Sequence, residues 1–465
     1  MSSSRHLRFH CHPQLPNSSD TDDPAPPFAK PQILKNVIVL SLGWAFLFTA
    51  FNAVANLQTS LNQEDGVGVK SLTTIYVGMI ASSMFLSDVV VSLLGCKWAI
   101  SLAMSGYTMY IAANFYAVQV TMIPAAVVLG LCSAPLWSAQ STYLTKMGGW
   151  YAKLTHQNKD GAINYFFGFF YMSHQSTQIW GNLISSLVFA PTIGNETSGS
   201  ACGAAFCPET SRNVSLNFEQ PTENVYTVCG IFLGCAVIGM AIIIKFLDNV
   251  HMGTSKSSRL SHRLLISAFN HLFTSPKQML LVPITIYRGL GAALFVGEFT
   301  KAFVSCALGI WNLGYVMICF GVANALSSVI SGRLVKFVGQ MPFFVVAFLV
   351  HMGLQIAFLW WDPSRDEVTY FYISAALWGV GNAIFQTQSN ALYGCLFTDS
   401  LGPAFANYRL WEGSGAAVAY AYSDLFCTNI KIYICLGVLT AGMLGYIVVM
   451  LMERIGGQKK CQVTE

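Results

Sequence analysis

The side chains that could do chemistry in this chain are few, and the most informative of them lie inside long apolar segments. Arg288 stands near the middle of one such segment. A charge in the hydrocarbon core of a membrane costs roughly 2.5–3.5 kcal/mol on insertion scales, so such groups pair with one another or serve a function. We expect Arg288 to pair with an acid from a neighbouring helix, with Asp88 or Asp424 as candidates. A cavity-facing cation for an anionic ligand and a snorkelling side chain are the alternatives.

A second pair of charges stands close together in the sequence. Arg409 and Glu412 are three residues apart, which places them on one face of a helix. The expected helix covers residues 407–427, so both residues fall in its first turn, where a charge costs little. The spacing therefore predicts an intrahelical ion pair at an inner gate.

Uncharged amides supply the other candidate sites. Gln175 and Gln178 share one helix face, and Gln386 and Asn390 share another. Such faces could line a cavity and bind a neutral polar solute, although amides that only hold helices together are the commoner case. The complete set of expected cavity-lining residues is Asn52, Gln140, Gln175, Gln178, Arg288, Gln386 and Asn390.

The pattern of histidines and cysteines predicts no catalytic or metal site. His174 and His351 are isolated, and neither has an acid partner that would suggest a proton relay. The 13 cysteines include no C-x-x-C pair, so zinc spacing is absent from the sequence. We therefore expect no enzyme activity, no cofactor and no metal.

The composition shows which elements must position these residues. Hydrophobic residues make up 54% of the 465 residues and charged residues 10%, against about 45–50% apolar and about 25% charged in soluble domains. The mean hydropathy is +0.52. These values are a poor fit to a soluble enzyme, a disordered protein or a nucleic-acid binder. The sequence predicts a polytopic membrane protein whose surroundings are the lipid bilayer.

Twelve segments are long and apolar enough to be spanning helices, which need about 20 residues each. Continuous apolarity excludes the alternation of a transmembrane barrel. The expected spans are 35–57, 71–94, 98–117, 121–143, 163–190, 225–247, 278–298, 309–331, 342–361, 368–394, 407–427 and 431–452. The fold class is thus an all-α membrane protein with twelve transmembrane helices.

The basic residues orient these helices. A cytosolic N-terminus puts 19 of the 25 Lys and Arg residues on the inner side and five on the outer side, as the positive-inside rule requires. Both termini are then cytosolic. The expected organisation is a Pro-rich disordered tail (1–34), a first half (35–247), a cytosolic linker (248–277), a second half (278–452) and a cytosolic tail (453–465).

The long outer loop, 191–224, holds the expected modifications. Asn195 and Asn213 each begin an N-glycosylation sequon. Four cysteines fall on the outer side, which allows three pairings. The short spacing favours a disulfide between Cys202 and Cys207.

The two sets of six helices look like a duplication. Short motifs recur at nearly constant offsets of 243 to 248 positions, each in the corresponding helix or loop. A parallel repeat of six helices is typical of the major facilitator arrangement, with a midplane cavity between the halves. The recurring pairs are Leu94-Gly95-Cys96-Lys97 with Val338-Gly339-Gln340, Gln140-Ser141 with Gln388-Ser389, and Asn164-Tyr165 with Asn407-Tyr408.

Several longer runs of the sequence are distinctive. They are Ala134–Gln140, Trp180–Phe189, Gly314–Phe320, Asn390–Gly394 and Ala404–Glu412. These runs resemble the uncoordinated-93 family of the major facilitator superfamily, and the similarity extends over about residues 35–452. The resemblance implies a twelve-helix facilitator fold at the plasma membrane with a glycosylated outer loop. It also implies a regulatory subunit of potassium channels or an escort that traffics other membrane proteins.

Three functions remain open. The resemblance favours a regulatory subunit of a potassium channel, acting on potassium homeostasis and membrane potential. The alternatives are a facilitative carrier of a small polar solute, which would use the amide faces, and a trafficking escort. A proton symporter ranks lower because it usually needs a titratable group in the cavity, and the first, fourth and tenth helices contain no carboxylate.

Overall fold

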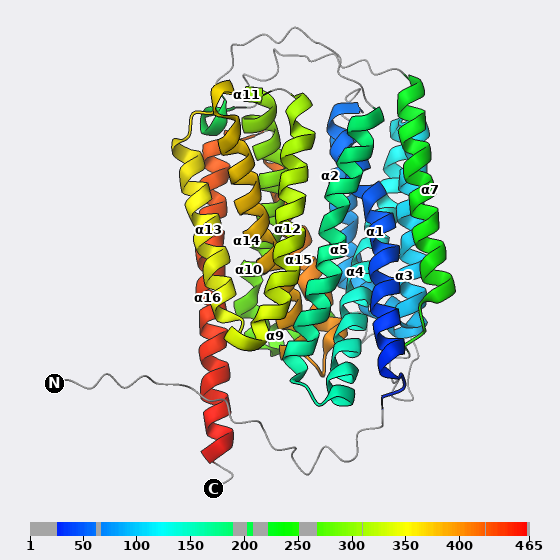
Figure 1. The fold of residues 1–465 in the computed structure, drawn as a ribbon, viewed down its shortest axis with the longest axis vertical. Coiled ribbons are helices and arrows are strands. Elements are labelled where there is room, and N and C mark those ends of the chain that lie inside the picture. Colours follow the sequence, from blue (N-terminus) through cyan, green and yellow to red (C-terminus); the bar gives the residue numbers. More distant parts are fainter. Residues whose placement is uncertain are drawn as a thin grey trace, which may run out of the picture.

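The computed structural model describes residues 26–61, 67–188, 202–207, 222–250, 267–308, 310–423 and 425–462. Within these ranges the regular structure is helical, and the long helices run side by side (Figure 1). The first six long helices are α1 (Lys30–Leu61), α2 (Val67–Phe85), α3 (Ser87–Ala113), α4 (Gln119–Thr155), α5 (Lys159–Val188) and α7 (Thr222–Phe246).

The second six helices form a similar group beside the first (Figure 1). A short helix, α9 (Ser267–Thr274), precedes them. The first of the six is α10 (Pro276–Ala293), which continues as the π-helix η5 (Leu294–Ser305) and α11 (Cys306–Leu308). The others are α12 (Ile310–Val338), α13 (Met341–Trp360), α14 (Val368–Leu396), α15 (Leu401–Ala421) and α16 (Thr428–Gln462). The predicted fold of twelve long helices in two halves is confirmed.

The helical bundle has two end faces. The terminal face is the end at which α1 begins and α16 ends, at the bottom of Figure 1. The opposite end, near α11, is called the disulfide face because the disulfides described below lie there. The short 3-10 helix η4 (Gly203–Ala205) lies at this end. Two further single turns, η3 (Asn114–Tyr116) and η6 (Arg365–Glu367), precede α4 and α14.

Hydropathy distinguishes nine of the long helical segments from the other three long helices. Nine helical segments of the described ranges are apolar and long enough to span a membrane by themselves. The three long helices outside this group are α2, α5 and α15. Two contacts between the halves use them, since α5 packs along α12 and α15 packs against α2. Their polar faces therefore meet protein rather than lipid.

The two loops that the repeat aligns share a backbone feature. Gly95 has φ +73° and Gly339 has φ +80°, the left-handed region that only glycine adopts without strain. Gly95 lies inside the bounds of α3, so the predicted second helix corresponds to α2 together with the first turns of α3. Each half thus turns at a glycine between its second and third predicted spans.

Asp248 fastens the end of α7 to the first turns of α1. Its carboxylate lies 2.8 Å from Lys35 Nζ and accepts hydrogen bonds from Gln32 and Asn36. Burial alone would raise the pKa of the Asp248 carboxyl, but the hydrogen bonds from α1 outweigh burial and lower it. Of the predicted linker, residues 251–266 lie outside the described part of the chain.

Candidate functional site

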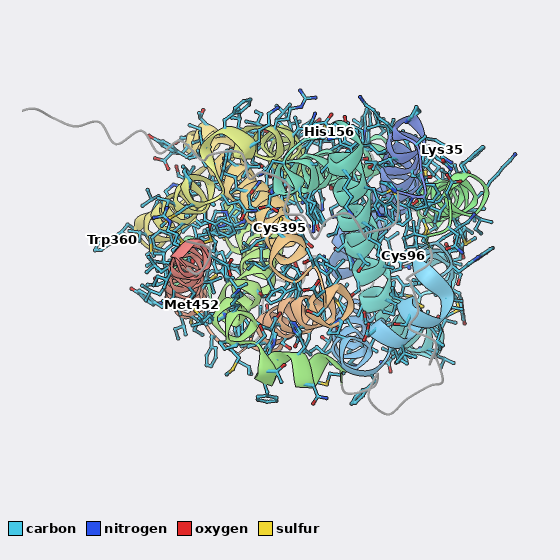
Figure 2. The ribbon with its side chains drawn as sticks, turned by 90° about the horizontal axis from the view of Figure 1, so that it is seen from below. Lys35, Cys96, His156, Trp360, Cys395 and Met452 are labelled. Carbon is cyan, nitrogen blue, oxygen red and sulfur yellow. A yellow bond between two sulfur atoms is a disulfide. The ribbon has the colours of Figure 1, made fainter. Side chains whose placement is uncertain are left out.

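Several of the charged and amide residues singled out from the sequence gather between the two halves. We call this group the central polar cluster. Seen from the terminal face, Cys395 at the end of α14 lies between the half that contains Lys35 and the half that contains Met452 (Figure 2). The members of the cluster are Ser141 of α4, Gln175 of α5, Arg288 of α10, Asn382, Gln386 and Asn390 of α14, and Arg409 and Glu412 of α15.

Glu412 lies between two guanidinium groups. Its Oε2 is 2.6 Å from Arg409 Nη1, and its Oε1 is 3.8 Å from Arg288 Nη2. Arg409 is 2% exposed, Arg288 6% and Glu412 17%. Two positive charges therefore share one carboxylate in a region shielded from solvent.

The acid beside Arg288 comes from a neighbouring helix, as expected, but it is not the predicted residue. It is Glu412. Asp88 lies instead against Gly402 at the start of α15, ten residues or about 15 Å along the helix from Glu412. Asp424, the other candidate, lies outside the described residues.

The pair Arg409–Glu412 forms as predicted, but deeper in the bundle than the inner gate expected from the sequence. Helix α15 begins at Leu401 rather than at 407, which puts Arg409 about 12 Å into the helix. Pro403 makes this helix start hard to recognise in the sequence, because proline usually interrupts a helix. It stands in the first turn, where its missing N–H interrupts no helical hydrogen bond.

Hydrogen bonds connect the halves through the cluster. Arg409 Nη2 donates to Asn390 Oδ1 at 2.7 Å and to Ser141 Oγ at 3.3 Å. Gln175 Nε2 donates to Gln386 Oε1 at 2.6 Å. These bonds join α4 and α5 of the first half to α14 and α15 of the second.

The other expected cavity residues are placed differently. Asn52 donates to Thr177 Oγ1 at 2.9 Å, a contact between α1 and α5 within the first half. Gln178 lies against Gly321 of α12. Gln140 is fully buried beside the cluster. Asn52 thus holds helices together rather than belonging to the cluster.

Sequence reasoning missed the aromatic side of the cluster. The Arg409 guanidinium lies 4.6 Å from the ring centroid of Tyr408 and 5.0 Å from that of Trp137, in cation–π range. His174 packs edge-on against Trp137, with centroids 5.1 Å apart. Trp137 belongs to the run Ala134–Gln140, but its residue type gives no sign of this role, because an aromatic residue in an apolar helix is usually part of the core.

Glu298 corrects another expectation. It ends the predicted span 278–298 on the outer side, where the sequence alone predicts a solvated carboxylate. It forms a buried ion pair instead, with Lys431 Nζ 2.8 Å from Glu298 Oε2 and Ser423 Oγ donating to Oε1 at 2.7 Å. Glu298 belongs to the π-helix η5, whose bounds extend seven residues beyond the predicted end at 298.

The predicted disulfide is also wrong. Cys202 is bonded to Cys306 and Cys207 to Cys427. The segment 202–207 docks on the second half: its Gly203 lies against Trp361 and Pro363, and Phe206 O accepts from Thr428 N at 3.0 Å. Its two cysteines therefore reach different helices instead of each other. Asn195 and Asn213 lie outside the described residues, and their glycosylation stays a prediction.

The approach of α10 to α15 brings Arg288 to Glu412, and Gly289 permits it. A Cβ atom on Gly289 would collide with the backbone carbonyl of Glu412. We expect Gly289→Ala to push the helices apart and to lower the free energy of unfolding by about 1–3 kcal/mol. Thermal unfolding of the purified protein measures this.

The matched control for this variant is Gly234→Ala on α7, where a Cβ would meet no atom within 4 Å. It should leave stability unchanged or raise it by about 0.5–1 kcal/mol, because alanine is the better helix former. Equal unfolding temperatures for the two variants would contradict the assigned role of Gly289.

The two six-helix halves with a polar cluster between them have the arrangement of the major facilitator fold. Solved structures of that fold align with the chain. The human organic anion transporter MFSD10 aligns with a TM-score of 0.61 at 12% identity over 90% of this chain and 99% of its own. The proton:xylose symporter XylE aligns with a TM-score of 0.61 at 11% identity over 92% and 96%. At these identities the likeness shows the fold alone.

Sequence comparisons identify the family. A family model described as "Ion channel regulatory protein UNC-93" matches residues 60–450. Protein unc-93 homolog A of Xenopus laevis is 40% identical over 93% of this chain and 96% of its own length, and the human homolog A is 41% identical over 89% and 92%. A Caenorhabditis elegans protein named for potassium channel regulation, unc-93, is 34% identical over 90% of this chain and 61% of its own length. The chain belongs to the UNC-93 family.

Proposed function

We propose that this chain is a non-enzymatic regulatory subunit of a potassium channel in the plasma membrane. The observation that carries the proposal is the match of the family described as ion channel regulatory over residues 60–450. The name of the Caenorhabditis elegans relative points to potassium as the conducted ion.

The contact between the halves supports a regulator over a carrier. The amides that a carrier would use for solute, Gln175 and Gln386, bond to each other. On α5 and α12 the helices meet backbone to backbone, because a Cβ on Gly168 would lie 2.9 Å from Gly332 Cα. The polar groups between the halves thus hold the halves together.

We further propose that the terminal face is cytosolic and the disulfide face extracellular. Disulfides form and persist in oxidising compartments, and both disulfides of the described residues lie at the disulfide face. The excess of basic residues on the other side gives the same orientation. We retain 35–247 and 278–452 as the proposed limits of the halves.

Current recording tests the proposal. A two-pore potassium channel is expressed with and without the chain, and current, surface abundance of the channel and uptake of small polar solutes are measured together. A regulatory subunit changes the current per surface channel. A change in surface abundance alone indicates an escort, and saturable uptake with unchanged current indicates a carrier.

The glycine variants supply a matched comparison in the same cells. Gly234→Ala should regulate the channel as the parent chain does. Gly289→Ala, compared at equal surface abundance, should have lost part of the effect, because the packing between α10 and α15 is disturbed. Equal regulation by the two variants would show that this packing is not needed for the effect.

A further inference from the structure

The central polar cluster carries one more positive charge than negative charge. Arg288 and Arg409 lie on either side of a single carboxylate, that of Glu412. The other hydrogen-bonding partners of the two arginines are uncharged: Asn382 for Arg288, and Asn390 and Ser141 for Arg409. The formal charge is therefore +1 in a place where charge is poorly solvated.

Among the residues that the structure describes, no second buried acid is free to balance this charge. Glu298 lies in the same half, but Lys431 already neutralises it at 2.8 Å. Three aromatic side chains interact electrostatically with both arginines: Tyr171, His174 and Tyr408. A neutral phenol or imidazole cannot balance a net charge.

An unused hydrogen-bond donor accompanies the unbalanced charge. The Nε–H group of Arg288 is buried without a hydrogen-bond partner among the described residues. The Arg409 side chain, by contrast, has Tyr171 of α5 beside it as a further uncharged partner. A buried donor without an acceptor is costly, so Arg288 Nε indicates an acceptor that the described residues do not supply.

We propose that the central polar cluster binds one monovalent anion between the two halves, either chloride or a small carboxylate. One negative charge neutralises the excess of the two arginines over Glu412. Guanidinium groups are also suited to such ligands, because they are permanently charged and present several N–H donors in one plane. The inference does not depend on channel regulation.

Binding would be linked to the contact between the halves. Arg409 already bridges them, since it bonds Ser141 of α4 and lies over Trp137 of the same helix. An anion on the two arginines would therefore strengthen the interaction of α10 and α15 with α4 and α5. Its occupancy should stabilise the contact between the two halves.

Thermal unfolding of the purified full-length protein tests the proposal. Chloride or acetate replaces bulky gluconate at constant ionic strength. Above its Kd, the bound anion should raise the unfolding temperature by about 1–3 °C for each tenfold increase in concentration. A rise with chloride alone assigns a chloride site, and a rise with acetate alone assigns a carboxylate site. A rise with both assigns a general site for monovalent anions, and no rise with either overturns the proposal.

Three variants localise the effect. Arg288→Gln removes the excess charge and should abolish the dependence on anion, while Arg288→Lys should retain it. Arg333→Gln, at an exposed arginine on α12, removes a charge elsewhere and should also retain it. Full dependence in Arg288→Gln would overturn the proposal. If that variant does not fold, binding of radiolabelled chloride or acetate to the parent protein tests the proposal instead. We expect one bound ion per chain, and no bound ion would contradict the proposal.

Discussion

Replacing Glu412 with Gln is expected to lower the free energy of unfolding by about 3–5 kcal/mol, the range seen when one partner of a buried ion pair is removed. The variant would leave two guanidinium groups with no carboxylate, although Arg288 and Arg409 are only 6% and 2% exposed. We expect a lower unfolding temperature of the purified protein and a smaller folded fraction in cells. Size-exclusion chromatography in detergent measures the folded fraction.

Two comparisons isolate the charge effect. Glu453→Gln removes an acid from the exposed pair with Lys277, where both partners are more than a third exposed, and should cost about 0–1 kcal/mol. The double variant Arg288→Gln/Glu412→Gln has the same formal charge in the cluster as the parent and should recover much of the lost stability. If Glu412→Gln unfolds at the temperature of Glu453→Gln, the carboxylate does not neutralise the arginines.

The fold was predictable because it depends on properties that a sequence displays directly. A span needs about 20 apolar residues whatever its neighbours are, and each of the twelve expected segments overlaps a long helix. The loops at Gly95 and Gly339 were predictable from their spacing in the repeat. Helix ends were less predictable, since α15 begins six residues earlier than expected and η5 extends the seventh helix.

For the site, the sequence predicted which residue types take part and which contacts form within a single helix. It did not predict contacts between helices. The pair Arg409–Glu412 follows from helical spacing, because residues three apart share a face. The approach of Arg288 to Glu412 depends on how closely α10 crosses α15, which the glycine at 289 decides. Spacing along one helix carries no information about such a crossing.

The disulfides show the same limit for a loop. Cys202 and Cys207 are only five positions apart in the sequence, which made a local bridge the simplest expectation. The docking of Gly203 against Trp361 and Pro363 instead points the two cysteines to the starts of α11 and α16. Long-range docking of a short segment leaves no periodic trace in the sequence.

Removing either disulfide is expected to destabilise the protein by about 2–4 kcal/mol. The bridges close separations of 104 and 220 residues and attach a segment of the loop that follows α5 to the second half. Cys202→Ser/Cys306→Ser and Cys207→Ser/Cys427→Ser each remove one bridge without leaving an unpaired thiol. In the absence of reductant, both variants should unfold at a lower temperature than the parent. Reductant should narrow this difference in unfolding temperature.

The control for these variants is Cys235→Ser/Cys319→Ser, which changes two cysteines that form no disulfide. It should stay within about 0.5 kcal/mol of the parent, since neither side chain is fully buried. Peptide mapping under non-reducing conditions should recover Cys202 linked to Cys306 and Cys207 linked to Cys427. A peptide that joins Cys202 to Cys207 would instead support the local disulfide predicted from the sequence. The segment 202–207 would then dock through the contacts of Gly203 and Phe206 alone, and the two double variants should become equal in stability.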